Sequence, residues 1–148
     1  MSNKKVQIED DSPLGALLFL FHKNQHKYIN NALREYGLNI NQALFILRMY
    51  YSEEYLCQDD LADAFYLSKS AIAKSLKDLE EKEFIMRERL SDNKRKYVLV
   101  LSAKGEAMVP IIKEINKDWE EKMKLDKVDK KFMNTLMTLT KRSIRLNN

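Results

Sequence analysis

The scarcity of glycine and proline constrains this chain more than any other sequence feature. Its 148 residues include only three glycines and two prolines, and these two residue types are the strongest breakers of helices and strands. Apolar residues recur with a helical period through most of the chain. One segment departs from that period: residues 91–105 read SDNKRKYVLVLSAKG, a turn-forming start, three bases, and then a β-branched and aromatic run. The sequence therefore predicts a mainly α protein with one small β-hairpin.

The length and the ends of the chain limit its class. At 148 residues a single domain is expected. No run of eighteen apolar residues occurs, and the start MSNKKVQIEDDSP has neither the apolar segment nor the cleavage site of a signal peptide. These features predict a cytoplasmic protein that does not enter a membrane.

Long helices are expected at both ends of the chain. Ser12 followed by Pro13 has the pattern of an N-cap, and Gly37 is a plausible stop for the first helix. A second long helix is expected from about Ala103, with a bend at Pro110. The last helix is expected from about Asp126 to Arg145 with two apolar faces. These faces are Val128, Phe132, Leu136 and Leu139 on one side and Met133, Met137 and Ile144 on the other.

Three shorter helices are expected between these ends. They run from about Asn41 to Tyr51, with Leu44, Ile46 and Leu47 facing inward, from Gln58 to Phe65, and onward from the N-cap Ser68. In the helix that starts at Ser68, Ile72, Leu76 and Leu79 fall on one side, whereas Ser70, Lys74, Lys77 and Glu81 point the opposite way. Two strands follow, FIMRERL and YVLVLS.

Charge changes sign along the middle of the chain. Residues 36–65 carry one base and five acids, whereas residues 66–104 carry ten bases and six acids. A polyanion would prefer the second segment, although a solvated charged surface gives the same count.

Two short helices followed by a basic hairpin match a helix-turn-helix with a wing, in which the second helix enters a major groove and the wing reaches the backbone or minor groove. This arrangement predicts binding to double-stranded DNA. The candidate DNA-binding residues are Ser68, Lys69, Ser70, Ala73, Lys74, Lys77, Arg87, Lys94, Arg95 and Lys96.

The order of these motifs resembles the MarR (multiple antibiotic resistance regulator) family of winged helix-turn-helix regulators. The resemblance rests on Leu38, Gln42, Leu47, Leu61-Ala62, Leu79-Glu80, Ile85, Arg87, Arg95 and Leu101-Ser102-Ala103-Lys104-Gly105. It implies a winged domain over about residues 38–104 and dimerisation helices over about 12–36 and 105–146. It further implies a homodimer on a pseudo-palindromic operator, and a repressor released by a small aromatic or anionic effector.

Two residues depart from the family pattern. Glu83 replaces the usual glycine before the first wing strand, so the preceding helix is expected to run on or to end without a left-handed cap. Asn93 occupies the place of the wing aspartate, so Arg95 is either held by Asp92 or freer than in the family.

Other candidate sites have ordinary explanations. His22 and His26 are spaced to meet one metal, but no further ligand can be named, so packed or interfacial histidines are expected. Cys57 is a redox sensor only if its thiolate is stabilised, and an inert cysteine is favoured. Aromatic residues at helical spacing are expected in the core rather than in a ligand pocket: Phe21, Tyr28, Tyr36 and Phe45.

The sequence lacks the motifs of an enzyme. It has no Gly-rich phosphate loop, no nucleophile elbow and only two histidines. No cofactor is expected. The alternative to a DNA-binding regulator is a winged-helix scaffold that binds other proteins, which the lysines on the recognition face argue against.

Overall fold

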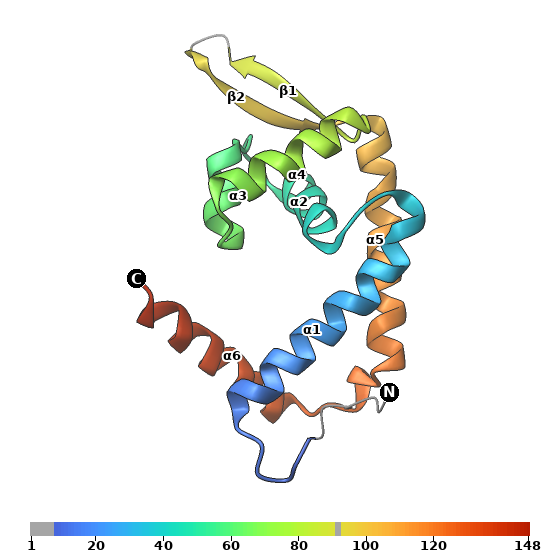
Figure 1. Ribbon diagram of the computed structural model, residues 1–148, viewed down its shortest axis with the longest axis vertical. Coiled ribbons are helices and arrows are strands. Elements are labelled where there is room, and N and C mark those ends of the chain that lie inside the picture. The colour runs from blue at the N-terminus through green and yellow to red at the C-terminus, as the bar shows by residue number, and fades with distance from the viewer. Residues whose placement is uncertain (1–7, 91–92) are drawn as a thin grey trace, which may run out of the picture.

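The computed structural model describes residues 8–90 and 93–148, without the side chains of residues 90 and 93–96. Six helices and a two-stranded antiparallel hairpin make up this part of the chain (Figure 1). Their bounds are α1 Leu14–Leu33, α2 Ile40–Tyr51, α3 Gln58–Phe65, α4 Lys69–Glu81, β1 Ile85–Leu90, β2 Asn93–Leu101, α5 Ala103–Lys122 and α6 Lys130–Leu146. The predicted mainly α fold with a small hairpin is confirmed.

The helices form two regions joined by α5. At one end, α2, α3, α4 and the hairpin make the winged domain (Figure 1). At the other end, α1 packs along α5, and α6 branches from the far end of α5. None of the described helices is long and apolar enough to cross a bilayer.

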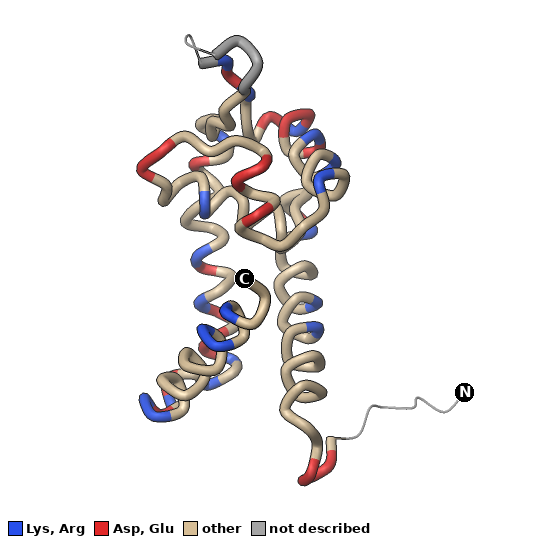
Figure 2. The backbone as a smooth tube through the Cα atoms, turned by 90° about the vertical axis from the view of Figure 1, so that its left-hand side faces the viewer, with Lys and Arg blue, Asp and Glu red and all other residues tan. Residues whose placement is uncertain are grey.

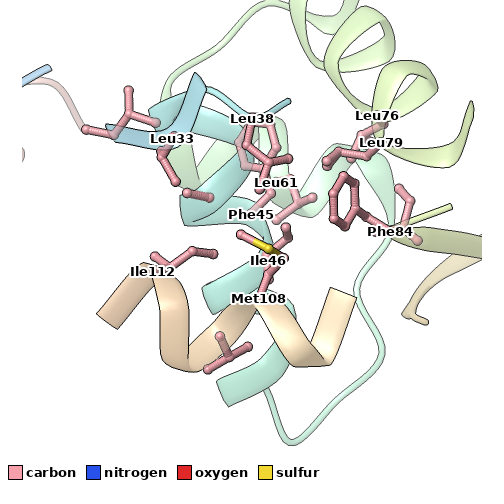
Figure 3. Packing of buried hydrophobic residues seen from close by; sticks show 14 of the residues in the cluster. Leu33, Leu38, Phe45, Ile46, Leu61, Leu76, Leu79, Phe84, Met108 and Ile112 are labelled. Atoms are coloured by element: carbon pink, nitrogen blue, oxygen red, sulfur yellow. The ribbon is translucent and has the colours of Figure 1, made fainter. Parts of the chain in front are cut away.

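The core lies in the winged domain and along its contact with α1 and α5 (Figure 3). Eight large side chains are fully enclosed there: Leu33, Phe45, Ile46, Leu61, Ile72, Leu76, Leu79 and Ile85. The predicted inward side of α4 is therefore confirmed. In α2 the prediction was partly wrong, because Leu44 remains 36% exposed. Ile46 and Phe45 are buried, as expected. Phe21 was also expected in the core, but it is exposed and meets Trp119 edge-on.

Helix starts follow their polar caps. The Ser68 hydroxyl accepts a hydrogen bond from the Ala71 N–H at 3.2 Å, and Asp129 caps α6 in the same way. The expected N-cap at Ser12 is wrong, because Pro13 holds that position and the Ser12 hydroxyl accepts from the Glu9 N–H instead. The last helix also begins later than expected, because a short 3-10 turn occupies Leu125–Lys127.

Two helix stops use the left-handed backbone. Gly37, at φ 71°, ends the 3-10 turn that follows α1, as predicted. Glu83, at φ 65°, ends α4, and the Phe84 N–H reaches back to the Leu79 carbonyl at 2.9 Å. The expectation that α4 would lack a left-handed cap was wrong, because glutamate adopts the strained conformation that glycine would adopt freely. Helix α5 continues through Pro110.

Candidate nucleic-acid interface

The outward side of α4 is free to meet a partner. Ser70, Lys74 and Lys77 are exposed, while the opposite side of the helix is in the core. Lys77 lies 4.0 Å from Glu81 in an exposed pair, a contact that contributes little to stability. Among the described residues, neither Lys69 nor Lys74 has an acidic partner. The N-terminal half of α4 thus presents two unneutralised cations, Lys69 and Lys74, and the exposed side chain of Ser70.

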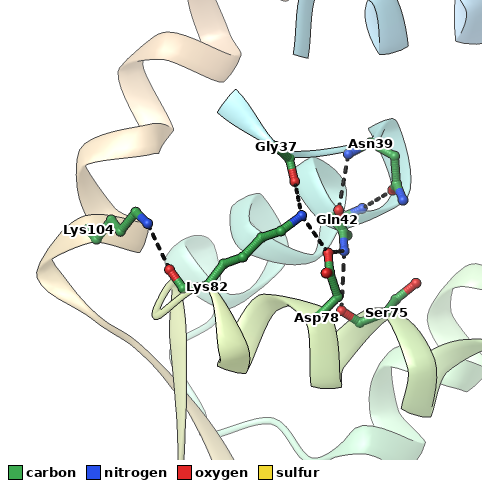
Figure 4. Close-up of polar contacts among 7 residues, drawn as sticks. All are labelled: Gly37, Asn39, Gln42, Ser75, Asp78, Lys82 and Lys104. Atoms are coloured by element: carbon green, nitrogen blue, oxygen red, sulfur yellow. Dashed lines mark hydrogen bonds and ion pairs between the residues drawn. The ribbon is translucent and has the colours of Figure 1, made fainter. Parts of the chain in front are cut away.

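A buried polar network fixes α4 to α2 (Figure 4). Gln42 is only 3% exposed, and its amide donates to the Asp78 carboxylate at 2.7 Å. The Lys82 ammonium donates to the same carboxylate at 3.0 Å and to the Gly37 carbonyl at 2.7 Å. Hydrogen bonds from Gln42 and Lys82 lower the pKa of Asp78 below its usual value. The network holds the C-terminal half of α4 against α2 and leaves the outward side of the helix exposed.

The start of α5 is fixed to the base of the wing. The Ser102 hydroxyl donates to the Glu83 carbonyl at 2.6 Å and accepts from the Gly105 N–H at 3.0 Å. A side chain at Gly105 would overlap the Phe84 carbonyl oxygen, so only glycine allows this close approach. The Lys104 ammonium donates to the Lys82 carbonyl at 2.8 Å (Figure 4). These contacts connect the end of α4, the wing and α5 in one rigid corner.

Arg87, a candidate DNA-binding residue, is engaged within the chain. Its guanidinium donates to the Glu80 carboxylate at 3.1 Å and to the Gln58 side chain at 3.4 Å. The residue therefore ties β1 to α4 and α3. The sequence alone gave no sign of this pairing, because its partners are 7 and 29 residues away along the chain.

The second strand of the wing begins earlier than predicted: β2 starts at Asn93, within the basic segment, rather than at Tyr97. The side chains of Lys94, Arg95 and Lys96 lie outside the described part of the structure. Asp92 also lies outside it, so a contact between Asp92 and Arg95 is not described. Their roles stay predictions. Arg89 is an exposed cation that the sequence analysis did not select, and it donates through Nε to the Tyr97 hydroxyl at 2.8 Å.

The charges separate across the winged domain as the sequence count suggested. Figure 2 shows acidic positions on α3 and the loop before it, whereas α4, at the right of the same domain, carries basic positions along its length and acidic positions at its C-terminal end. An anionic partner would therefore meet α4 rather than α3.

Comparison with known proteins identifies the group to which this arrangement belongs. The family model described as MarR family matches residues 38–97. The crystal structure of MarR is 30% identical in sequence, with a TM-score of 0.82, over 95% of this chain and 97% of that one. The chain belongs to the MarR family.

More distant structures share the fold. A MarR transcriptional regulator from Methanosarcina mazei Go1 is 23% identical, with a TM-score of 0.79, over 90% of this chain and 97% of that one. A MepR–DNA complex from S. aureus is 15% identical, with a TM-score of 0.81, over 91% of this chain and 98% of that one. No curated protein sequence matches the chain.

The residues that carry the MarR resemblance mostly hold α4 in place. Gln42 anchors its buried side, Arg87 pairs with it, and Ser102 and Gly105 fix its C-terminal end to α5. These residues make the MarR scaffold rather than a binding surface.

The other candidate residues do not assemble into a metal site. The His22 and His26 rings lie 3.8 Å apart between centroids, and no cluster of three metal-binding side chains occurs among the described residues. Burial, followed by His22 and Lys23, lowers the pKa of His26. Cys57 is half-buried before α3, where its N–H donates to the Asp60 carboxylate at 2.8 Å.

The turn between α3 and α4 carries one residue that the sequence analysis passed over. Tyr66 is 78% exposed and adopts a left-handed backbone conformation, with φ 54°. A tyrosine directly before Leu67-Ser68, outside every apolar stripe, was the signal available in the sequence.

Proposed function

We propose that this protein is a sequence-specific, double-stranded DNA-binding transcriptional regulator that acts as a homodimer. The observation that carries the proposal is the exposed side of α4, where Lys69, Ser70 and Lys74 stand without acidic partners on a helix fixed firmly along its other side. A helix of this kind can enter the major groove with its N-terminal residues against base edges. Lys94, Arg95 and Lys96 would reach the backbone or the minor groove beside it.

The dimer is proposed from the apolar surface of the terminal helices. Phe19 in α1 is 60% exposed, and Phe132 and Met137 in α6 are each 54% exposed. A twofold interface would cover both helices with the same surface of a second copy. Two recognition helices about 34–36 Å apart would then require a roughly palindromic site.

The binding proposal is tested by titrating the protein with the DNA upstream of its own gene and with a random duplex, across a salt series. Specific binding should exceed random binding by on the order of 1,000-fold or more, with a steep salt dependence. Equal affinity for both duplexes at every salt concentration would contradict it.

Single substitutions locate the surface. Lys74→Ala should lower affinity by about 1–3 kcal/mol for certain sequences only if the side chain reads a base, and for all sequences alike if it contacts phosphate. Lys77→Ala should also weaken binding. Lys117→Ala, an exposed lysine of α5, is the matched control and should leave affinity unchanged. Unchanged affinity in both α4 variants would show that the helix does not enter the groove.

Arg95→Ala should cost more affinity than Lys94→Ala or Lys96→Ala, because a planar guanidinium suits a narrow minor groove. Thermal unfolding should hardly change, since a substitution near the tip of the wing, away from the core, is nearly neutral. Equal losses of affinity for all three variants would indicate that the wing contributes only a diffuse positive charge.

Repression relieved by a small aromatic or anionic effector is the finer part of the proposal. A cavity of about 190 Å³ lies where α1, α2 and α5 meet. His22, His26 and Asn116 provide polar groups, and Ile29, Leu47 and Ile115 provide apolar walls. Substituted benzoates should release DNA from the wild-type protein and fail to do so when Leu47→Trp fills the cavity. A DNA affinity that no member of such a panel alters would contradict this part.

The protein-binding scaffold remains the rival function. A scaffold would show no salt-dependent affinity for duplex DNA, so the same salt series separates the two.

A further inference from the structure

Tyr66 ends α3 with a backbone conformation that is unfavourable for tyrosine. Its backbone lies at φ 54° and ψ 38°, and the N–H of Leu67 bonds the Ala62 carbonyl at 3.1 Å to end the helix. A left-handed conformation is rare for residues other than glycine, asparagine and aspartate because Cβ crowds the backbone. Gly37 makes a similar stop, at φ 71°, without that strain. The turn itself therefore does not require a tyrosine.

The ring of Tyr66 gains no packing in return. Its side chain is 78% exposed, whereas Phe45 and Phe65 meet edge-on at a centroid distance of 5.2 Å. Among the side chains that the structure describes, which exclude those of residues 90–96, no aromatic ring or cation stacks on the phenol. Strain combined with an exposed aromatic ring, neither of which helps the fold, is typical of a residue retained for binding.

The position of Tyr66 indicates what it would bind. It lies two residues before Ser68, the N-cap of α4, so its side chain emerges at the same helix end as Lys69 and Ser70. A recognition helix enters the groove with this end, and the phosphates that border the groove accept hydrogen bonds from tyrosine hydroxyls.

We propose that Tyr66 is a DNA-contacting residue whose hydroxyl donates a hydrogen bond to a backbone phosphate beside the groove that α4 enters. This inference rests on the proposed DNA-binding function. It adds an uncharged phosphate contact to the lysines already selected, and it explains why a strained tyrosine occupies this turn.

The test uses two glycine variants with opposite expectations for binding. Tyr66→Gly and Glu83→Gly each relieve a left-handed backbone, one at each end of α4. Both should raise the Tm, by about 2–4 °C. Tyr66→Gly should also weaken DNA binding about tenfold, on operator and random duplex alike, because a phosphate contact carries no sequence information. Glu83→Gly should bind at least as tightly as the wild type, since it removes a negative charge.

Tyr66→Phe keeps the ring and the backbone and removes only the hydroxyl. It should show most of the loss of affinity with little change in Tm. A Tyr66→Gly protein that is more stable and binds DNA as tightly as the wild type overturns the inference. Wild-type affinity in Tyr66→Phe overturns the hydrogen bond to phosphate.

Failure of the inference is distinguishable from failure of the proposed function. If the wild-type protein does not prefer its operator, the proposed function fails. If the wild type binds and Lys74→Ala weakens it, while both Tyr66 variants do not, only the role of Tyr66 is wrong.

Discussion

The winged domain and the terminal helices use the same amphipathic patterning with opposite results. Leu76 and Leu79 of α4 are completely buried within their own chain, whereas Phe132 of α6 is 54% exposed and no residue of α6 is buried. The helical spacing of apolar residues therefore predicts that one side of a helix is buried, but not which element buries it. In the winged domain the neighbouring elements supply it, and at the terminal helices another surface has to do so.

The largest effect is expected from a substitution in the terminal helices. Met137→Glu places a charge on the apolar side of α6, where the residue is 54% exposed in the single chain. It should convert a dimer at micromolar concentration into a monomer. Affinity for a palindromic operator should fall by on the order of 100-fold, because two linked half-site contacts become one.

Thr138→Glu is the control, since it introduces the same charge at the next residue, on the polar side of α6. Sedimentation of both variants and the wild type distinguishes the cases. A wild-type monomer, or a Met137→Glu dimer, would contradict an interface through α6. Removal of residues 126–148 should give a monomeric or poorly soluble protein that no longer binds its operator.

The second prediction concerns a substitution in the packing of the winged domain. Gly105→Ala would overlap the Phe84 carbonyl oxygen and should lower the free energy of unfolding by about 3 kcal/mol, as overpacking in a rigid site does. Gly15→Ala is the matched control, because a methyl group there meets nothing within 4 Å. This control should stabilise α1 by about 0.5–1 kcal/mol. Chemical denaturation measures both, and equal effects would show that the corner at Gly105 is not tightly packed.

A smaller effect is expected from the polar network of α4. Asp78→Ala leaves the buried Gln42 amide without its main acceptor and should cost about 1–2 kcal/mol. Because the pKa of Asp78 is lowered in the folded protein, its contribution is present above the usual value of 3.8 and is lost as pH falls through the lowered pKa. Stability curves of wild type and variant should therefore converge below about pH 4. Asp63→Ala removes an exposed carboxylate of α3 and is the control, which should change the free energy of unfolding at pH 7 by less than about 0.5 kcal/mol.

The smallest predicted effect concerns His26, which lies where the two regions meet. Burial, with His22 and Lys23 nearby, lowers its pKa from 6.5, so the unfolded chain binds the proton more readily. Stability should be complete above pH 6.5 and decline as pH falls from 6.5 towards the lowered pKa. His26→Gln should flatten that decline in thermal unfolding between about pH 7.5 and 5.5. A decline of the same size in the variant would assign it to other groups.

Local signals predicted the winged domain well. Gln58–Phe65 is a helix with the predicted bounds, and the N-cap at Ser68 set the start of α4 correctly, because a cap and an apolar spacing act within a few residues. Which side of α2 is buried depends on its neighbours, so Leu44 was predicted to face inward although it remains 36% exposed.

The candidate site was predicted less completely. The exposed side of α4 followed from its period, but the engagement of Arg87 required partners from α3 and α4. The strained cap at Glu83 was missed because glycine is favoured there but not obligatory. For Tyr66 the sequence showed a tyrosine outside every apolar stripe, but not its left-handed backbone, which depends on how α3 ends.

The rigid corner at Ser102 and Gly105 has a mechanical consequence. Helix α5 has 20 residues and is therefore about 30 Å long, and its first turn is bonded to the residues that end α4 and begin the wing. A tilt of about 5° at its far end would move the corner by about 2.6 Å over that length. In the proposed homodimer, the separation of two such corners would therefore depend on the angle between the two copies of α5.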